Sequence, residues 1–384
     1  MVGIMQKRLC FIIDDMGFRG GAHVATFNLI KALAAKGIIV NVLAISVPEQ
    51  GIDVSRYIAG TRLIRLKHGL LAKIERHIGQ FACGNWPLCQ FEGLKEIVKW
   101  LKSHDTVCCI SEVSTLRWLV ASLGNSCRKV QFIHTDYVGW TQLSPQSRSA
   151  TRFDSVIYSR MDCIGIVGAS NSKRLKQRFP QLADRIFPFY NLIDRPQMKA
   201  GKKGLNKCFT IATVGRPNWG SPKKTEFSIK VAAELKRRGV KFTWKVYGSG
   251  PSEDVKRLNN YAAKLKVADC FLLAGYTPNI TAEVRSAEIM ALLSAYEGCA
   301  NSIYEALICG TPVIATDVGC ASEQIQDNVT GRIVRMNVGA VADVIEALIK
   351  DETILACWRK NLEGYKYDND FALNGLAKLL GIES

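Results

Sequence analysis

Two glutamates eight residues apart, Glu297 and Glu305, are the most informative feature of the sequence. The second lies in a short helix that we expect to begin at Asn301-Ser302 and to end at Gly310. Amides at a helix start, together with the positive end of the helix dipole, suit a diphosphate. Glu305, one turn further along, can accept hydrogen bonds from ribose hydroxyls, and Glu297 would lie on the sugar side of the phosphate. The alternative is that two exposed acids have this spacing by chance.

Basic residues follow a predicted strand in the same half of the chain. Arg216 comes directly after the apolar run 210–214 and Gly215, and Lys223 and Lys224 follow in the next loop. A guanidinium and an ammonium can neutralise the charge that builds on a departing nucleoside diphosphate, a task otherwise left to a metal ion. Either lysine could bind the phosphate, and we favour Lys223. The alternative is a solvated loop and helix start.

At this point a family resemblance can be stated. The stretch SAYEGCANSIYEALICGTPVIATDVG at 294–319 resembles the Glu-x7-Glu signature of the retaining GT-B glycosyltransferases of family four. The segment GRPNWGSPKK is similar to the Gly-Arg and lysine of that family, with an unusual Pro-Asn-Trp insert. The resemblance is strong over 205–335 and weaker over 1–195.

The resemblance implies a role for each of these residues. It implies Glu305 on the ribose, Glu297 near the donor sugar, Arg216 and Lys223 on the phosphates, and the backbone amides of a helix start on the phosphate as well. Those amides belong to Asn301, Ser302 and Ile303. The implied enzyme is a retaining hexosyltransferase of the bacterial surface-polysaccharide or lipopolysaccharide type that uses neither a metal nor another cofactor.

Three weaker features resemble the same family. Gly248 lies in a glycine turn after the strand 242–247, which by itself could be only a turn. Gly20 and Gly21 lie in a loop that is not a GxGxxG fingerprint, so a dinucleotide site is unfavoured; bare backbone there could approach the donor, although a structural turn is the alternative. A lone histidine such as His134, at a strand end, is usually structural, but the family places one there to contact the donor sugar.

Short apolar runs alternate with helix-length segments through both halves, which predicts an α/β fold of two Rossmann-like domains facing a central cleft, the GT-B arrangement. We expect an acceptor-binding domain over 1–195, a nucleotide-sugar-binding domain over 196–350, and C-terminal helices over 351–384 that pack back toward the first domain. Expected strands are 8–14, 38–45, 106–110, 130–134, 163–168, 208–214, 242–247, 270–274, 289–293 and 312–316.

The net charge of +17 on 384 residues is concentrated in the first half, where residues 1–195 carry 26 basic and 14 acidic side chains. Such an excess indicates an anionic partner. The basic, partly apolar segment 56–76 could rest on anionic lipid headgroups or be a solvated face. With no apolar run of about 20 residues and with thirteen scattered cysteines, we expect a cytoplasmic protein that can lie at the inner face of the membrane.

The expected partners are a nucleotide diphosphate sugar, with UDP or GDP as the nucleotide, and a lipid-linked or oligosaccharide acceptor, but no nucleic acid. A nucleotide-sugar epimerase of the same fold is one alternative. A basic nucleic-acid-binding module is another, although the sequence shows no reader motif. A catalytically inactive binding subunit is disfavoured by the presence of Glu297, Glu305 and Arg216.

Overall fold

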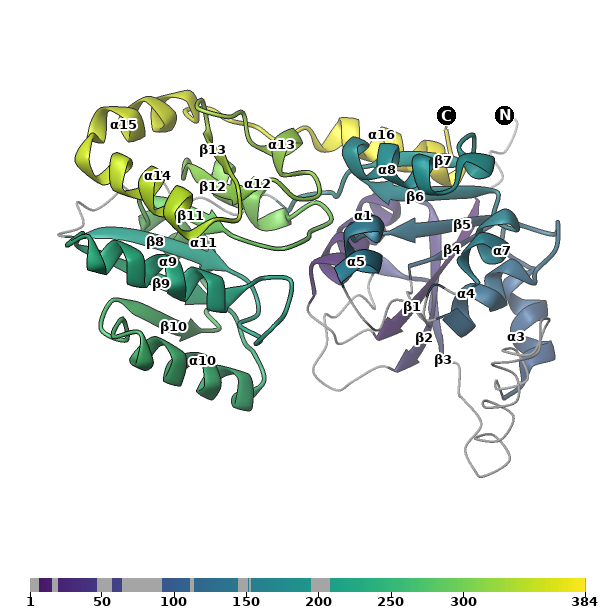
Figure 1. Cartoon of the computed structure of the whole chain (residues 1–384). Coiled ribbons are helices and arrows are strands. Elements are labelled where there is room, and N and C mark those ends of the chain that lie inside the picture. The colour runs from purple at the N-terminus through teal and green to yellow at the C-terminus, as the bar shows by residue number, and fades with distance from the viewer. Residues whose placement is uncertain are drawn as a thin grey trace. The chain divides into compact units, whose positions relative to one another are not determined.

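The computed structural model describes residues 7–15, 20–46, 57–63, 92–110, 114–143, 151, 153–194 and 208–383. The chain forms two compact units (Figure 1). The N-terminal unit consists of Met1–Leu192 with Asp368–Ser384, and the C-terminal unit of Ile193–Tyr367. Each contains one parallel sheet covered by helices, so the predicted α/β class is confirmed.

The sheet of the N-terminal unit has seven strands in the order β3-β2-β1-β4-β5-β6-β7. Every neighbouring pair is parallel. The strands are β1 (Arg8–Asp15), β2 (Ile39–Ser46), β3 (Gly60–Leu63), β4 (Thr106–Cys109), β5 (Arg128–Ile133), β6 (Cys163–Val167) and β7 (Ile186–Phe189). The helices between them are α1 (Gly21–Ala35), α3 (Leu94–Leu101), α4 (Ser114–Ala121), α5 (Tyr137–Leu143), α7 (Asp154–Ser159) and α8 (Ala169–Arg178).

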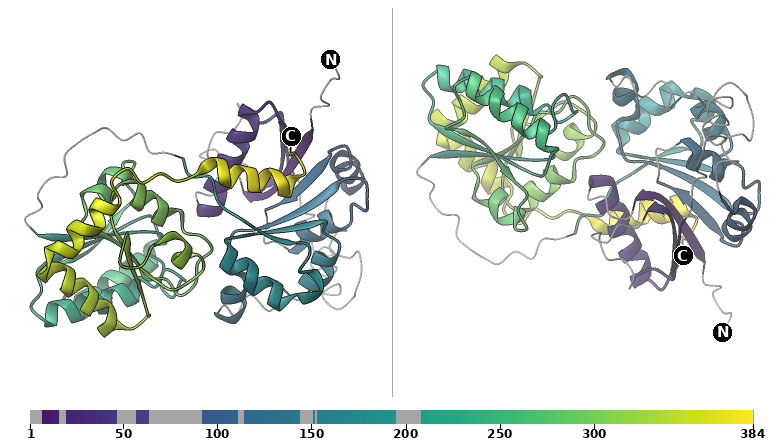
Figure 2. Two further views of the ribbon diagram at one scale, coloured as in Figure 1. Left: turned by 90° about the horizontal axis from the view of Figure 1, so that it is seen from above. Right: turned by 90° about the horizontal axis from the view of Figure 1, so that it is seen from below.

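The last helix of the chain, α16 (Asn369–Leu380), belongs to this unit and lies on β5, β6 and β7 (Figure 2). The Thr106 hydroxyl and the Arg128 Nε donate hydrogen bonds of 3.0 Å to the carbonyls of Leu380 and Leu379. A Cβ at Gly165 would lie 3.0 Å from Leu379 Cδ1, so the glycine leaves room for the helix. The N-terminal unit is therefore built from two segments that are far apart in sequence.

The sheet of the C-terminal unit has six parallel strands in the order β10-β9-β8-β11-β12-β13. The strands are β8 (Phe209–Val214), β9 (Phe242–Tyr247), β10 (Phe271–Gly275), β11 (Ile289–Leu292), β12 (Val313–Thr316) and β13 (Gly331–Val334). The helices are α9 (Thr225–Arg237), α10 (Ser252–Lys264), α11 (Ile280–Ser286), α12 (Asn301–Ile308), α13 (Ala321–Gln324), α14 (Val338–Lys350) and α15 (Glu352–Asn361).

Helices cover both faces of this sheet, as the alternation of β11 shows. Ile289 and Ala291 join a core cluster with α9, α10 and α14, whereas Met290 and Leu292 join a second cluster with α11 and α12. Because both faces are buried, the strand reads as a continuous apolar run. This pattern explains why the central strands are predictable from sequence.

Three strands are missing from the sequence prediction, and all three lie at a sheet edge: β3, β7 and β13. Each has only four residues. In β7 the middle residues Phe187 and Pro188 are exposed, and a proline inside so short a run argues against a strand. Edge strands of four residues give too weak a pattern to predict.

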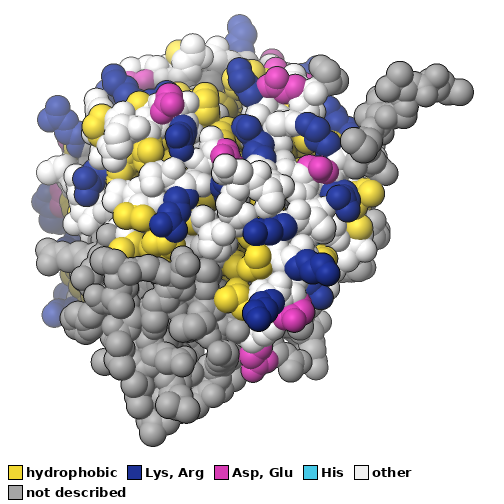
Figure 3. Space-filling view, turned by 90° about the vertical axis from the view of Figure 1, so that its right-hand side faces the viewer, with side chains coloured by type: hydrophobic (Ala, Val, Ile, Leu, Met, Phe, Trp, Pro, Cys, Tyr) yellow, Lys and Arg dark blue, Asp and Glu magenta, His cyan; other side chains and the backbone are white. Residues whose placement is uncertain are grey.

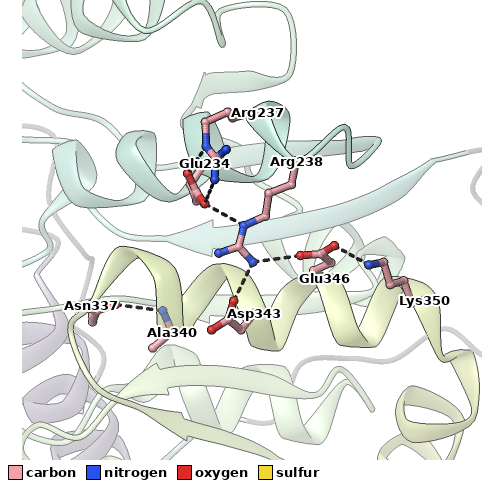
Figure 4. A network of polar contacts seen from close by, with 8 residues as sticks. All are labelled: Glu234, Arg237, Arg238, Asn337, Ala340, Asp343, Glu346 and Lys350. Atoms are coloured by element: carbon pink, nitrogen blue, oxygen red, sulfur yellow. Dashed lines mark hydrogen bonds and ion pairs between the residues drawn. The ribbon is translucent and has the colours of Figure 1, made fainter.

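An ion-pair network joins α9 to α14 in the C-terminal unit (Figure 4). Arg238, which follows α9, donates from Nη1 to Asp343 at 2.6 Å and to Glu346 at 2.9 Å. Its Nε donates to Glu234 at 2.8 Å. The Asn337 side chain accepts a hydrogen bond from the Ala340 amide and so caps α14. The network ties together two helices that cover the same face of the sheet.

Candidate active site

The candidate site residues of the C-terminal unit come from one edge of its sheet. Arg216 follows β8, Gly248 follows β9, and Ser294 and Glu297 follow β11. All neighbouring strands here are parallel, so these residues lie at the carboxyl edge, where open α/β sheets bind ligands. Arg216 is exposed at this edge.

The centre of the site is an ion pair between Lys223 and Glu297. Lys223 Nζ lies 2.7 Å from Glu297 Oε1, and the two side chains are 28% and 15% exposed. Lys224, in contrast, pairs with Glu226 at 3.6 Å. Its φ of 46° places its backbone in the left-handed region, directly before α9. The two lysines therefore have different partners, and Lys223 is the one that contacts Glu297.

A hydroxyl that the sequence analysis did not single out completes this arrangement. Ser294 is fully buried, and its hydroxyl donates a hydrogen bond of 2.6 Å to the same Oε1 of Glu297. Its own carbonyl accepts a 2.6 Å hydrogen bond from the Thr316 hydroxyl at the end of β12. Glu297 Oε1 is thus held from two directions by a cation and a hydroxyl. The only sequence signal for Ser294 is a small polar residue at a strand end, three positions before the glutamate.

The loop between β11 and α12 is fixed along its length. The Ala295 amide donates to the Pro222 carbonyl at 2.7 Å, which ties this loop to the one that carries Lys223. Gln324 Nε2 donates to the carbonyl of Ala300 at 2.9 Å, directly before α12. A Cβ at Gly319 would lie 2.2 Å from the Glu297 carbonyl, so only glycine fits beside this loop.

Close backbone packing also surrounds Arg216. Gly248 has a φ of 143°, and a Cβ there would lie 2.3 Å from the Gly215 carbonyl oxygen. The aliphatic carbons of Lys223 cross over Gly215, since a Cβ on that glycine would lie 3.3 Å from Lys223 Cδ and Cε. The glycines therefore allow two loops and a lysine stem to share a small volume. This is a structural reason for Gly248, in addition to the nucleotide contact expected from sequence.

Helix α12 begins at Asn301, as the sequence predicts, and Gly310 after its end has a φ of 73°. Of the three amides that the sequence analysis assigned to the phosphate, that of Ile303 donates a 3.0 Å hydrogen bond to the carbonyl of Ala300 in the structure. Glu305 is partly buried one turn into the helix. Burial raises the pKa of Glu305 above its ordinary value.

The remaining predicted site residues belong to the N-terminal unit. Gly20 precedes α1 and its carbonyl accepts a 3.0 Å hydrogen bond from the Val24 amide. Among the described residues, no atom would lie within 4 Å of a Cβ at Gly21. The described part of the fold therefore does not itself require a glycine at position 21. Residues 16–19 of the same loop lie outside the described residues.

His134 follows β5, and its ring packs against Phe189 and Phe132, with ring centroids 5.1 and 6.4 Å away. Both ring nitrogens are buried. Burial lowers the pKa of His134 to about 4; the Asn191 side chain opposes this shift, and the His23 imidazole adds to it. The imidazole is therefore neutral at pH 7. A neutral imidazole can donate one hydrogen bond and accept another.

Two features are absent from the described residues, a metal-binding cluster and a membrane-spanning helix. In those ranges we find no set of three or more His, Cys, Asp or Glu side chains arranged to hold a metal ion. Within the same part of the chain, none of the helices combines the length and apolar character needed to span a membrane. Most of the basic segment 56–76 lies outside the described residues.

Comparisons with known sequences identify residues 208–351 as a match to the family described as Glycosyl transferases group 1. Alpha-D-kanosaminyltransferase of Streptomyces kanamyceticus is 29% identical over 152 residues, which cover 38% of this chain and 38% of that protein. N-acetyl-alpha-D-glucosaminyl L-malate synthase of Bacillus anthracis is 34% identical over 172 residues, covering 43% of this chain and 44% of that protein. The chain thus matches less than half the length of these curated relatives.

Solved structures resemble the chain over nearly its whole length. The crystal structure of Anabaena HepE in complex with UDP and glucose has a TM-score of 0.76 at 16% identity, covering 98% of this chain and 99% of that one. WaaG, a glycosyltransferase involved in lipopolysaccharide biosynthesis, has a TM-score of 0.72 at 13% identity, covering 97% and 99%. Identities this low show the fold alone. The fold is the GT-B type with two parallel-sheet α/β domains, which confirms the predicted class.

Proposed function

We propose that this chain is a retaining glycosyltransferase that moves a hexosyl unit from a nucleotide diphosphate sugar to a lipid-linked or saccharide acceptor. The observation that carries the proposal is the 2.7 Å pair of Lys223 and Glu297 at the carboxyl edge of the second sheet. In the proposal, Lys223 is the cation for phosphate and Glu297, in the loop before α12, is the carboxylate for sugar hydroxyls. The match of residues 208–351 to the group 1 glycosyltransferases supports it.

In this proposal the C-terminal unit binds the donor. Arg216 and Lys223 bind the diphosphate, together with the amides of Asn301 and Ser302, while Gly248 lets the nucleotide approach the backbone. Glu305 accepts hydrogen bonds from the ribose. Because its pKa is raised by burial, donor affinity should fall on acidification at a higher pH than for an exposed glutamate.

Glu297 and the N-terminal unit bind the transferred sugar. Lys223 and Ser294 both contact Oε1 of Glu297, which leaves Oε2 to accept hydrogen bonds from sugar hydroxyls. His134 is neutral at pH 7 because of its low pKa; in the proposal one of its buried ring nitrogens becomes accessible when the sugar binds and exchanges a hydrogen bond with a sugar hydroxyl. Gly20 and Gly21 offer bare backbone to the donor, and the tolerance of the fold for a Cβ at Gly21 supports a ligand-based reason for that glycine.

The proposed reaction takes place on one face of the sugar. The acceptor hydroxyl oxygen bonds to the anomeric carbon from the side on which the bond to the diphosphate oxygen breaks. The leaving phosphate oxygen takes the hydroxyl proton, so the anomeric configuration is retained. Arg216 and Lys223 supply the positive charge that stabilises the departing diphosphate, and in this proposal no metal ion is required.

The comparisons suggest where to look for substrates. HepE was crystallised with UDP and glucose, so a UDP-sugar is the first donor to test and a GDP-sugar the second. WaaG takes part in lipopolysaccharide biosynthesis, which supports a role in bacterial polysaccharide or lipopolysaccharide assembly. The alternatives of a nucleotide-sugar epimerase and of a nucleic-acid-binding module are not favoured by these relatives.

A lipid-linked acceptor would place the enzyme in the cytoplasm at the inner membrane face. Figure 3 shows Lys and Arg side chains spread among apolar ones over one side of the molecule, with fewer acidic groups. Lys95, Lys99 and Lys102 are exposed on and directly after α3. Each basic side chain near an anionic surface contributes about 1 kcal/mol. Co-sedimentation with phosphatidylglycerol vesicles, but not with phosphatidylcholine vesicles, would support this contact.

The proposal is tested by incubating the purified full chain with UDP-, GDP- and ADP-sugars and measuring release of the nucleoside diphosphate, with and without EDTA. We expect release from one nucleotide class, unaffected by EDTA, and at least 100-fold slower in the Glu297→Gln variant. Proton NMR of the glycosylated product should show the anomeric configuration of the donor. The proposal would be rejected if none of the donors released its nucleoside diphosphate and the protein instead epimerised the sugar nucleotide or retained RNA.

A further inference from the structure

Trp219 belongs to the Pro-Asn-Trp insert of the loop that carries Arg216 and Lys223. Its ring packs against the core of the C-terminal unit on the side of α9 and α10. Tyr261 of α10 meets it edge to face, with ring centroids 5.4 Å apart and planes at 82°. The Arg257 guanidinium of the same helix lies over the indole, 4.0 Å from its centroid. Edge-to-face packing and a cation over the ring are both attractive arrangements for an indole.

The residues between Arg216 and Trp219 form a tight, well-supported turn. The Asn218 amide donates to the Arg216 carbonyl at 3.0 Å. Pro217 is buried, and a Cβ at Gly250 would lie 2.5 Å from its carbonyl oxygen. The turn is thus pressed against the glycine loop that leads into α10. Any freedom at Trp219 would be transmitted to Arg216, three residues away.

The far end of the same loop is already fastened, by the Ala295 amide on the Pro222 carbonyl at 2.7 Å and by the Lys223 to Glu297 pair. The end that carries Arg216 packs on the glycine loop at Gly250, and the Trp219 indole fastens it to α10. We propose that Trp219 is a positioning residue that holds Arg216 in place for the diphosphate of the donor.

This inference rests on the proposed function, and it concerns a residue that does not itself touch the donor. Pre-ordering a loop strengthens binding because the ordering cost is met before the ligand arrives. Loss of the indole should therefore weaken diphosphate binding only through Arg216. A residue that merely stabilises the fold would weaken binding whether or not Arg216 is present.

A double-mutant cycle separates these two cases. The full chain and its W219A, R216A and W219A/R216A variants are titrated with UDP, GDP and ADP by calorimetry, and the nucleotide that binds most tightly is used throughout. We expect W219A to weaken binding about 5- to 10-fold and R216A about 10- to 100-fold. The double variant should bind no more weakly than R216A alone.

Three further variants serve as controls. W219F keeps an aromatic ring and should recover binding to within about twofold of the unaltered chain. R257A leaves the indole in place and should weaken binding about two- to threefold. K256A, which removes a neighbouring exposed cation of α10, should have no effect. Thermal melting of every variant shows whether the C-terminal unit is intact.

Additive effects in the double variant, or unchanged binding by W219A, would overturn this inference while the proposed function stands. Failure of the unaltered chain to bind UDP, GDP or ADP would overturn the proposed function and this inference with it.

Discussion

Replacing Lys223 and Lys224 one at a time by methionine tests the proposed site directly, because the two lysines are adjacent and similarly exposed, at 28% and 32%. Methionine removes the ammonium but keeps a flexible apolar side chain. Only Lys223 pairs with Glu297, while Lys224 pairs with Glu226. We expect Lys223→Met to weaken binding of a nucleoside diphosphate and Lys224→Met to leave it unchanged.

The magnitude follows from the burial of the pair. A hydrogen bond from a charged donor contributes about 1.5 to 3 kcal/mol. Because Lys223 is 28% exposed, the lower half of that range applies, about 2 kcal/mol, or roughly 30-fold in affinity. The substitution also leaves the Glu297 carboxylate without its cation, which adds repulsion toward the diphosphate. Partly exposed ion pairs contribute about 0 to 1 kcal/mol to folding, so the melting temperature should change little.

Calorimetric titration with UDP and with uridine separates phosphate binding from binding of the nucleoside. Lys223→Met should lose affinity for UDP and keep its affinity for uridine. The reasoning would be refuted if Lys224→Met lost as much UDP affinity as Lys223→Met, or if uridine affinity fell in parallel with that for UDP. Circular dichroism melts of both variants serve as the control for folding.

Three further predictions concern the same groups. Ser294→Ala should lower kcat about 10-fold and change KM for the donor less than threefold, because the Glu297 carboxylate loses its orientation but keeps its charge. Steady-state kinetics measure both constants, and Ser294→Cys, whose thiol is a weaker hydrogen-bond donor, is the second variant. The prediction is wrong if both variants match the unaltered enzyme. Gly248→Ala should destabilise the chain by about 3 kcal/mol or more, since its Cβ would lie 2.3 Å from the Gly215 carbonyl oxygen. Gly21→Ala, the matched control, should melt no lower than the unaltered chain. Equal melting temperatures of the two variants would contradict this prediction. The free energy of unfolding should fall as the pH is lowered from about 6.5 to 4, because His134 takes up a proton in the unfolded chain but not in the folded one, where its pKa is about 4. Urea unfolding at pH 7.5 and pH 5 measures this loss, which should be about 2 kcal/mol smaller in His134→Phe. An identical loss in the variant would exclude His134 as the cause.

The central elements of the fold could be predicted because burial leaves a strong pattern. Strands such as β8 and β11, with helices on both faces, read as apolar runs with polar or glycine residues at their ends. Three short edge strands could not be predicted; β7, for example, has only four residues and contains Pro188, which argues against a strand. The helix α12 was predicted from residue types at its two ends, which act locally.

The candidate site could be predicted at the level of residue types but not of partners. The sequence favours Lys223 over Lys224 but does not reveal their partners, because these depend on backbone geometry: Lys224 has a φ of 46° and pairs with Glu226 of α9. Ser294 is one small polar residue among many, and its role depends on a contact across three residues of an irregular loop. Trp219 was noticed as an insert, but its contact with α10 spans about 40 residues of sequence.

The position of α16 has a consequence for how the protein is made. The ribosome synthesises Ile193–Tyr367 in full before it reaches this helix. Until residues 369–380 have been made, the nascent N-terminal unit lacks the helix that packs on β5, β6 and β7 and buries Leu376, Leu379 and Leu380. The C-terminal unit can therefore complete its core first, and the N-terminal unit reaches its final form only after Ile193–Tyr367 has been synthesised.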